Sequence, residues 1–172
     1  MGKKGKGGGT GGGSSLLLLG IVLFVVAWFV PVCKGQELFA GLGSVTREFG
    51  SSPEAVGAAL DGPEWLPGWP ACQFAWQLLI DDHPQGSGNA WKQRVAGASC
   101  LTNVVMLLAL AFAATRRTHP LLGAALLACA GVDASWIWLS DRNPFEWLRI
   151  GYFLWLASFP LVGLAMLRRP RS

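Results

Sequence analysis

Hydrophobic residues of this chain are gathered in long runs that short polar segments separate. Four runs approach the roughly twenty apolar residues that an α-helix needs to cross about 30 Å of hydrocarbon. They are residues 15–33, 97–115, 120–140 and 147–167. The pattern predicts an all-α integral membrane protein, folded as a bundle of four transmembrane helices.

The first run, 15–33, is also typical of a signal peptide, because lysines precede its apolar stretch. However, no small-x-small cleavage site follows closely, and Pro31 and Val32 are unfavourable for a lipoprotein-type cleavage before Cys33. We therefore interpret this run as an uncleaved anchor. The Gly-rich residues 1–14 cannot bury enough apolar surface to fold, so we expect a disordered basic tail there.

A fifth apolar stretch, 65–80, is too short to cross the bilayer. Pro67 and Pro70 confine its helical part to 70–80, about 16 Å at 1.5 Å per residue. We expect a short amphipathic helix that is either interfacial or re-entrant. Three tryptophans would lie at the lipid headgroups, namely Trp65, Trp69 and Trp76.

The longest segment between predicted spans is 34–96, which we interpret as an extracytoplasmic loop that contains this short helix. Its other apolar residues predict two more short amphipathic helices. One runs from about Leu38 to Phe49, where the hydrophobic positions share a helical face, and the other follows Ser52, a favourable N-cap residue.

Basic residues lie mainly at the ends of the runs and indicate the orientation of the chain. With four spans, one side of the membrane holds Lys3, Lys4, Lys6, Arg116, Arg117, Arg168, Arg169 and Arg171. Cytoplasmic segments are enriched in Lys and Arg, so both termini, including the tail 168–172, are predicted to be cytoplasmic. The net charge of +4 is accounted for by these clusters. The lipid bilayer is thus the expected partner, nucleic acid is not, and the composition favours a bacterial inner (plasma) membrane.

A membrane protein with four helices and four cysteines resembles the vitamin K epoxide reductase type of thiol–quinone enzyme. That chemistry uses a closely spaced pair, whereas Cys33, Cys72, Cys100 and Cys129 are scattered along the chain. Cys33 and Cys72 are both expected on the outer face, where an oxidising compartment would permit a disulfide between them. Cys100 and Cys129 are expected to be free and buried.

Other chemical groups are few. The two histidines, His83 and His119, lie outside the predicted spans, which disfavours a haem held between helices. The chain also has no Ser/His/Asp order, zinc-ligand spacing or phosphate-binding loop. The sequence therefore predicts no catalytic residues, no metal and no cofactor.

One carboxylate, Asp133, lies inside a predicted span. Counting residues along the helices brings Asn103 and Tyr152 to a similar depth, and Arg149 lies near the outer mouth with a stem long enough to reach inward. Because an unpaired charge in lipid is costly, Asp133 should face the bundle interior. Three interpretations stay open: a structural hydrogen-bond cluster, a proton or ligand site that opens outward, and a shallow aspartate in contact with water.

Three short motifs resemble a loose group of small bacterial inner-membrane proteins of unassigned function. They are LPGW at 66–69, the single Asn103 near the start of the second span, and GYFLWLAS at 151–158; Pro31 also fits the pattern. The long outer loop and Asp133 depart from it. The resemblance implies topology and no activity.

For function, we favour a non-enzymatic accessory or scaffolding subunit of a larger membrane complex, bound to a partner membrane protein or to copies of itself. Two small-xxx-small pairs, Ala124 with Ala128 and Gly131 with Ser135, support this hypothesis because small residues allow helices to approach closely. The alternative is a small transporter, channel or proton-coupled factor that uses Asp133.

Overall fold

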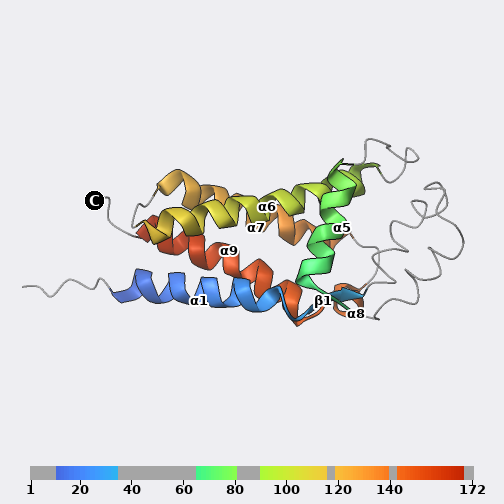
Figure 1. Cartoon of the computed structure of the whole chain (residues 1–172), viewed down its shortest axis with the longest axis horizontal. Coiled ribbons are helices and arrows are strands. Elements are labelled where there is room, and N and C mark those ends of the chain that lie inside the picture. The colour runs from blue at the N-terminus through green and yellow to red at the C-terminus, as the bar shows by residue number, and fades with distance from the viewer. Residues whose placement is uncertain (1–10, 35–64, 81–89, 116–118, 140–142, 169–172) are drawn as a thin grey trace, which may run out of the picture.

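The structure is a computed structural model that describes residues 11–34, 65–80, 90–115, 119–139 and 143–168. Four helices lie side by side, and a fifth crosses one end of the bundle together with two short strands and a one-turn helix (Figure 1). In chain order they are α1 (Gly11–Ala27), β1 (Pro31–Lys34), β2 (Trp65–Pro67), α5 (Gly68–Ile80), α6 (Ala90–Ala114), α7 (Pro120–Leu139), α8 (Pro144–Trp147) and α9 (Ile150–Arg168).

Three of the predicted apolar helices are confirmed as long helices. The stretches Gly97–Ala114 of α6, Pro120–Ile137 of α7 and Ile150–Arg168 of α9 are long and apolar enough to cross a membrane. The fourth, α1, is apolar but has only 17 residues, which is about 25 Å at 1.5 Å per residue. Length and composition thus suit a helical membrane protein, with a shorter first helix than the sequence predicts.

The first helix ends at Ala27 and does not reach Cys33, which corrects the predicted run 15–33. Proline disfavours a helical conformation at the residue before it, so the helix does not continue through Val30, and the extended segment begins at Pro31. Residues Pro31–Lys34 then pair with Trp65–Pro67 as an antiparallel two-stranded sheet. The fold is therefore mostly helical and not purely all-α. At its other end α1 begins at Gly11, within the segment 1–14 that we expected to be disordered.

The helix packing follows the order α1, α9, α7, α6, and glycines mark the close approaches. A side chain at Gly20 of α1 would collide with Val162 of α9 at 2.7 Å, and one at Gly123 of α7 would meet the backbone oxygen of Gly163 at 2.9 Å. Small residues let these backbones meet, as is usual between membrane helices.

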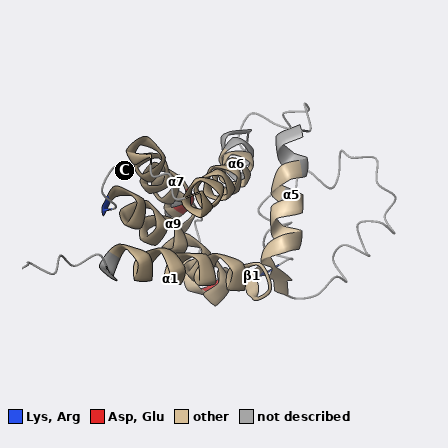
Figure 2. Cartoon of the chain, turned by 60° about the vertical axis from the view of Figure 1, so that its left-hand side comes forward, with Lys and Arg blue, Asp and Glu red and all other residues tan. Residues whose placement is uncertain are grey.

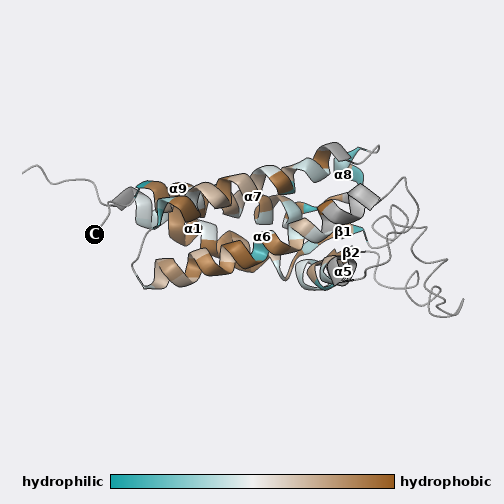
Figure 3. Cartoon of the chain, turned by 90° about the horizontal axis from the view of Figure 1, so that it is seen from above, coloured by the Kyte–Doolittle hydropathy of each residue, from teal (hydrophilic) through white to brown (hydrophobic). Residues whose placement is uncertain are grey.

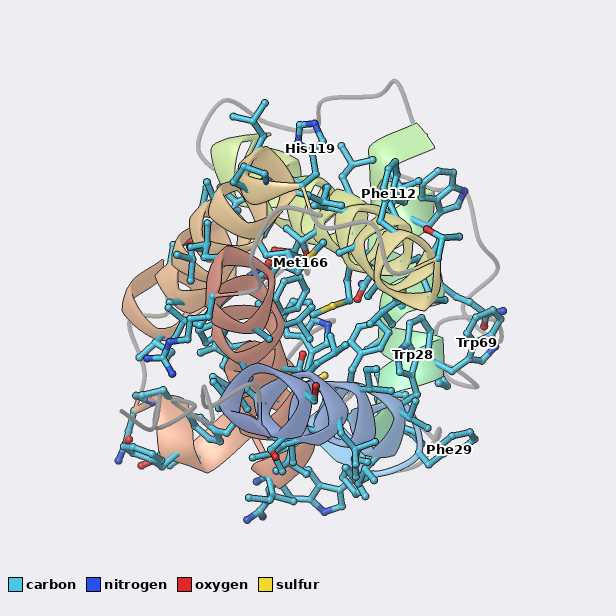
Figure 4. The ribbon with its side chains drawn as sticks, turned by 90° about the vertical axis from the view of Figure 1, so that its left-hand side faces the viewer. Trp28, Phe29, Trp69, Phe112, His119 and Met166 are labelled. Carbon is cyan, nitrogen blue, oxygen red and sulfur yellow. The ribbon has the colours of Figure 1, made fainter. Side chains whose placement is uncertain are left out.

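The core lies between the four helices. Its fully buried side chains include Phe159, Val162, Met106 and Leu126, and Figure 4 shows Met166 pointing into the same central region. Within the described residues α1 and α6 hardly contact each other, while both contact α9, whose Phe159 lies edge-on against Phe24 of α1. The bundle is thus an arc whose two ends, α1 and α6, are bridged at one end by α5.

Helix α5 runs steeply across the ends of the other helices (Figures 1 and 2). It begins at Gly68 and not at residue 70, because Pro70 falls in the first turn, where its missing N–H costs nothing. Gly68 lies against the end of α1, since a side chain there would meet the backbone oxygen of Ala27 at 2.5 Å. The two outer-loop helices predicted after Leu38 and Ser52 lie outside the described residues.

Candidate functional site

A buried polar layer joins α6, α7 and α9 around Asp133, which has no exposed surface. The Thr102 hydroxyl donates to Asp133 Oδ1 at 3.3 Å, and the Tyr152 hydroxyl donates to the backbone carbonyl of Asp133 at 2.6 Å. Among the described residues, no group bonds to Asp133 Oδ2. The predicted inward position of Asp133 agrees with this burial, which speaks against the water-exposed interpretation.

The Thr102 contact is the weaker of two bonds made by that hydroxyl. Thr102 Oγ1 also lies 2.6 Å from the backbone oxygen of Ser99, one turn earlier in α6. A hydroxyl has a single proton, so the shorter bond to the Ser99 carbonyl competes with the bond to Asp133. The hydrogen bond from Thr102 to the carboxyl group is consequently weak.

Trp136 and Ser99 extend the buried polar layer around Asp133 toward the end of α7. Trp136 Nε1 donates to Ser99 Oγ at 2.7 Å, and Ser99 Oγ in turn donates to the Val95 carbonyl at 3.2 Å. These bonds connect the faces of α6 and α7 that pack together. The arrangement satisfies polar groups within the bundle, as buried polar groups require.

Asn103 belongs to a second cluster and does not bond to Asp133. Its side-chain oxygen accepts a 2.8 Å hydrogen bond from Trp155 Nε1 of α9, and its amide nitrogen donates to Cys72 Sγ of α5 at 3.7 Å. The predicted shared layer of Asp133, Asn103 and Tyr152 is therefore divided. A helix turns about 100° per residue, so Thr102 faces Asp133 while Asn103 faces α9 and α5.

Arg149 does not reach the polar layer, contrary to the prediction. It is exposed, and its guanidinium carbon lies 3.7 Å from the centre of the Trp65 ring, while Lys34 Nζ lies 5.1 Å from the same ring. The backbone N–H of Arg149 donates to the Val32 carbonyl at 2.9 Å, which fixes this residue beside β1. Stacking on an indole ring is a favourable alternative to burying the charge.

The three predicted interfacial tryptophans differ in their surroundings. Trp65 is half-buried in β2 beneath the two cations, whereas Trp69 and Trp76 of α5 are 56% and 44% exposed. The centre of the Trp69 ring lies 5.4 Å from that of Trp28, the residue that follows α1, with the rings tilted by 39°, and the two rings lie side by side in Figure 4. Exposed indoles at the end of an apolar bundle are typical of membrane interfaces.

The structure does not bring Cys33 and Cys72 together as the predicted disulfide. Cys33 is a free, buried thiol in β1, where its backbone bridges to Leu148. Cys72 Sγ instead lies 3.6 Å from Cys100 Sγ. The prediction was wrong because α5 packs along α6, a long-range contact that the spacing of the cysteines does not reveal.

Sequence reasoning missed Ser99, Thr102, Trp136 and Trp155. The available signal was weak: Ser99 and Thr102 are spaced by three residues and so share a helical face, but serine and threonine are common in membrane helices.

Within the described residues, no three His, Cys, Asp or Glu side chains are arranged to hold a metal ion. No protein-family model, curated protein or solved structure matches the chain.

Proposed function

We propose that the protein is a four-span integral membrane protein with cytoplasmic termini, and that it is a non-enzymatic accessory or scaffolding subunit of a larger membrane complex. Its outward surfaces support the membrane assignment. Hydrophobic residues run along the parallel helices (Figure 3), and large exposed ones include Leu18, Val25, Leu107 and Leu121. A continuous apolar exterior of this kind is unfavourable in water and favourable in lipid.

The arrangement of the helices supports the orientation. The start of α1 and the end of α9 lie at one end of the bundle, and α5, α8 and the sheet lie at the other (Figure 1). The basic residues at 3–6, 116–117 and 168–171 flank the first end in the sequence. The steep crossing of α5 over the other end suits a helix that lies at the interface and does not span.

The outward face of α7 is the observation that supports a partner subunit. Only 17% of its apolar stretch is buried inside the chain, against 39% for α6 and 44% for α9. The small residues Ala124, Ala128 and Gly131 all face outward, and nothing lies within 4 Å of where a Gly131 side chain would begin. The hydroxyl of Ser135 donates to the Val132 carbonyl of its own helix at 2.6 Å.

This face differs from one that contacts lipid alone. Lipid-facing positions are commonly filled by large apolar residues, whereas small residues at three- and four-residue spacing allow a second helix to approach closely. The glycines at internal contacts, Gly20 and Gly123, are already covered by neighbouring helices. Ala124, Ala128 and Gly131 are not covered, so we propose that they bind an apolar helix of a partner membrane protein or of a second copy.

The test is purification in mild detergent with mass analysis of the intact assembly. We expect a stoichiometric partner or a defined oligomer from the unmodified chain, and its loss from the Ala128→Leu variant. Ala111→Leu is the matched control, because Ala111 is also exposed but belongs to α6. An Ala128→Leu variant that keeps the partner, or an unmodified chain that is always a lone monomer, would contradict the proposal.

Topology is tested separately with cysteines introduced at Gly62 and Gly86, in a chain without its native cysteines. If α5 does not cross the membrane, an impermeant maleimide added from outside labels both positions. Labelling at residue 62 together with protection at residue 86 until the membrane is permeabilised would exclude the four-span arrangement.

A second candidate is a proton-coupled factor or small transporter that uses Asp133. The observation in its favour is the buried carboxyl oxygen Oδ2, which has no hydrogen-bond partner among the described residues. Buried polar atoms without partners often mark functional groups. This candidate predicts that Asp133→Asn folds normally but abolishes proton or solute flux into proteoliposomes. Flux that persists in this variant excludes it.

A further inference from the structure

Two thiols from different helices meet where α5 crosses α6. Cys72 Sγ and Cys100 Sγ are 3.6 Å apart, and Cys100 Sγ also lies 3.7 Å from the backbone oxygen of Cys72. Asn103 Nδ2 donates a hydrogen bond to Cys72 Sγ at 3.7 Å, and Asn103 Oδ1 accepts one from Trp155 Nε1. The sulfur of Cys72 is thus contacted by Cys100 and Asn103 of α6, and Trp155 of α9 holds Asn103 in place.

We propose that Cys72 and Cys100 form a reversible disulfide that locks α5 across the open side of the bundle. The bond requires sulfurs at about 2.05 Å, so the two sulfurs must approach each other from 3.6 Å when it forms. Such a pair does not need adjacent positions in the sequence. The proposal does not depend on the presence of a partner subunit.

The position of α5 explains what the disulfide would control. Its first turn is held at the end of α1, where the Trp69 N–H donates to the Trp28 carbonyl at 3.3 Å and the two indole rings are in contact, tilted by 39°. Cys72, one turn later, is held at α6. At this end of the bundle α5 contacts both the end of α1, where Gly68 lies against Ala27, and α6, so it is a strap between them. The disulfide makes that strap covalent, and reduction leaves it attached by packing alone.

The two thiols differ in access, which assigns the order of the exchange. Cys100 is buried, whereas Cys72 is half-buried and can meet an incoming reagent.

The oxidant is a protein disulfide from the compartment that α5 faces. The Cys72 thiolate attacks one donor sulfur, forming a mixed disulfide and releasing the second donor sulfur as a thiolate. Cys100, after losing its proton, attacks Cys72 Sγ and expels the first donor sulfur. The donor gains two electrons and becomes a dithiol, and the two protons that the cysteines lose end on the donor thiols or in water.

The experiment uses the full chain in lipid nanodiscs, with oxidised glutathione as the disulfide probe. After oxidation the protein is denatured, which exposes the buried Cys33; we then expect two of the four thiols to be unavailable to maleimide, and reduction to restore them. Peptide mapping without reduction should join Cys72 to Cys100 in the unmodified chain and equally in Cys33→Ser and Cys129→Ser. Cys72→Ser and Cys100→Ser should lose the protected pair.

The mechanical consequence is measured by amide hydrogen exchange over residues 68–80. Oxidation should slow exchange in the unmodified chain and leave it unchanged in Cys100→Ser, because only the disulfide adds a constraint on local opening. A bond between Cys33 and Cys72, or four thiols that stay free when other accessible dithiols are oxidised, would overturn the proposal. So would a disulfide that leaves the exchange of α5 unaltered.

Discussion

The Tyr152 hydroxyl donates its hydrogen bond to the backbone carbonyl of Asp133, at 2.6 Å, and not to the carboxylate. Tyr152 therefore ties α9 to the backbone of α7, whatever side chain residue 133 carries. The carboxylate oxygen Oδ1 accepts a bond from Thr102 of α6, and the Ser99 hydroxyl of α6 also lies near the carboxyl group. The tyrosine and the aspartate thus make separable contributions to the same layer.

Tyr152→Phe should destabilise the bundle. The substitution keeps the buried ring and removes one buried hydrogen bond, so we expect the free energy of unfolding to fall by about 1 kcal/mol. Unfolding by titrated denaturing detergent measures it. The matched control is Thr115→Val, which removes an exposed hydroxyl bonded to the Phe112 carbonyl and should change stability by less than about 0.5 kcal/mol. Equal effects of the two substitutions would show that the Tyr152 bond contributes nothing specific.

Asp133→Asn should leave the unfolding free energy within about 1 kcal/mol of the unmodified chain, because Oδ1 accepts a long hydrogen bond from Thr102 and Oδ2 has no partner among the described residues. The isosteric amide keeps the shape of the side chain and removes a buried acid. Detergent-induced unfolding of the two proteins side by side measures the difference. A loss of several kcal/mol would mean that the carboxyl makes a stronger interaction than its contacts with the described residues indicate.

Depth in the bundle was predictable from the sequence, but helix rotation was not. Counting 1.5 Å per residue correctly brought Asp133 and Tyr152 to one layer. It could not decide between Thr102 and Asn103, which are adjacent in sequence and differ by about 100° in direction. Only the packing of α6 against α7 selects Thr102 for Asp133.

Long-range contacts were the second limit. Pro31 is a local signal that ends α1 early, and a stricter use of it would have shortened the predicted first helix. By contrast, the neighbours of Cys72 depend on where α5 lies, which no local pattern states. The small residues of α7 show the same limit: Ala124, Ala128 and Gly131 were recognised as a packing face, but the sequence could not show that this face points away from the bundle.

Cys33 should resist alkylation until pH is high. Burial raises the pKa of the Cys33 thiol to about 12, so at pH 8 its thiolate is roughly a thousandfold scarcer than that of an ordinary cysteine. Burial favours the protonated Cys33 thiol in the folded state. The contribution of this thiol to the free energy of unfolding is therefore complete below the ordinary thiol pKa, and it is lost as the pH rises toward 12. Maleimide labelling of the reduced protein, followed by peptide mapping, should find Cys72 modified before Cys33. Equal rates at pH 8 would contradict the buried position in β1.

Two glycines of α7 should respond oppositely to the same substitution. Gly123→Ala places a methyl group 2.9 Å from the backbone oxygen of Gly163 and 2.9 Å from the Leu167 side chain. The backbone cannot move aside cheaply, so we expect a loss of about 1–3 kcal/mol in unfolding free energy. Gly131→Ala meets nothing within 4 Å, and alanine is the better helix former by up to about 1 kcal/mol. It should therefore be neutral or stabilising.

Because both glycines lie in one helix, the comparison isolates packing from helix propensity, and unfolding in the same detergent measures both variants. A stable Gly123→Ala variant would show that α7 and α9 do not meet at Gly163, and the order of the helices in the bundle would have to be revised.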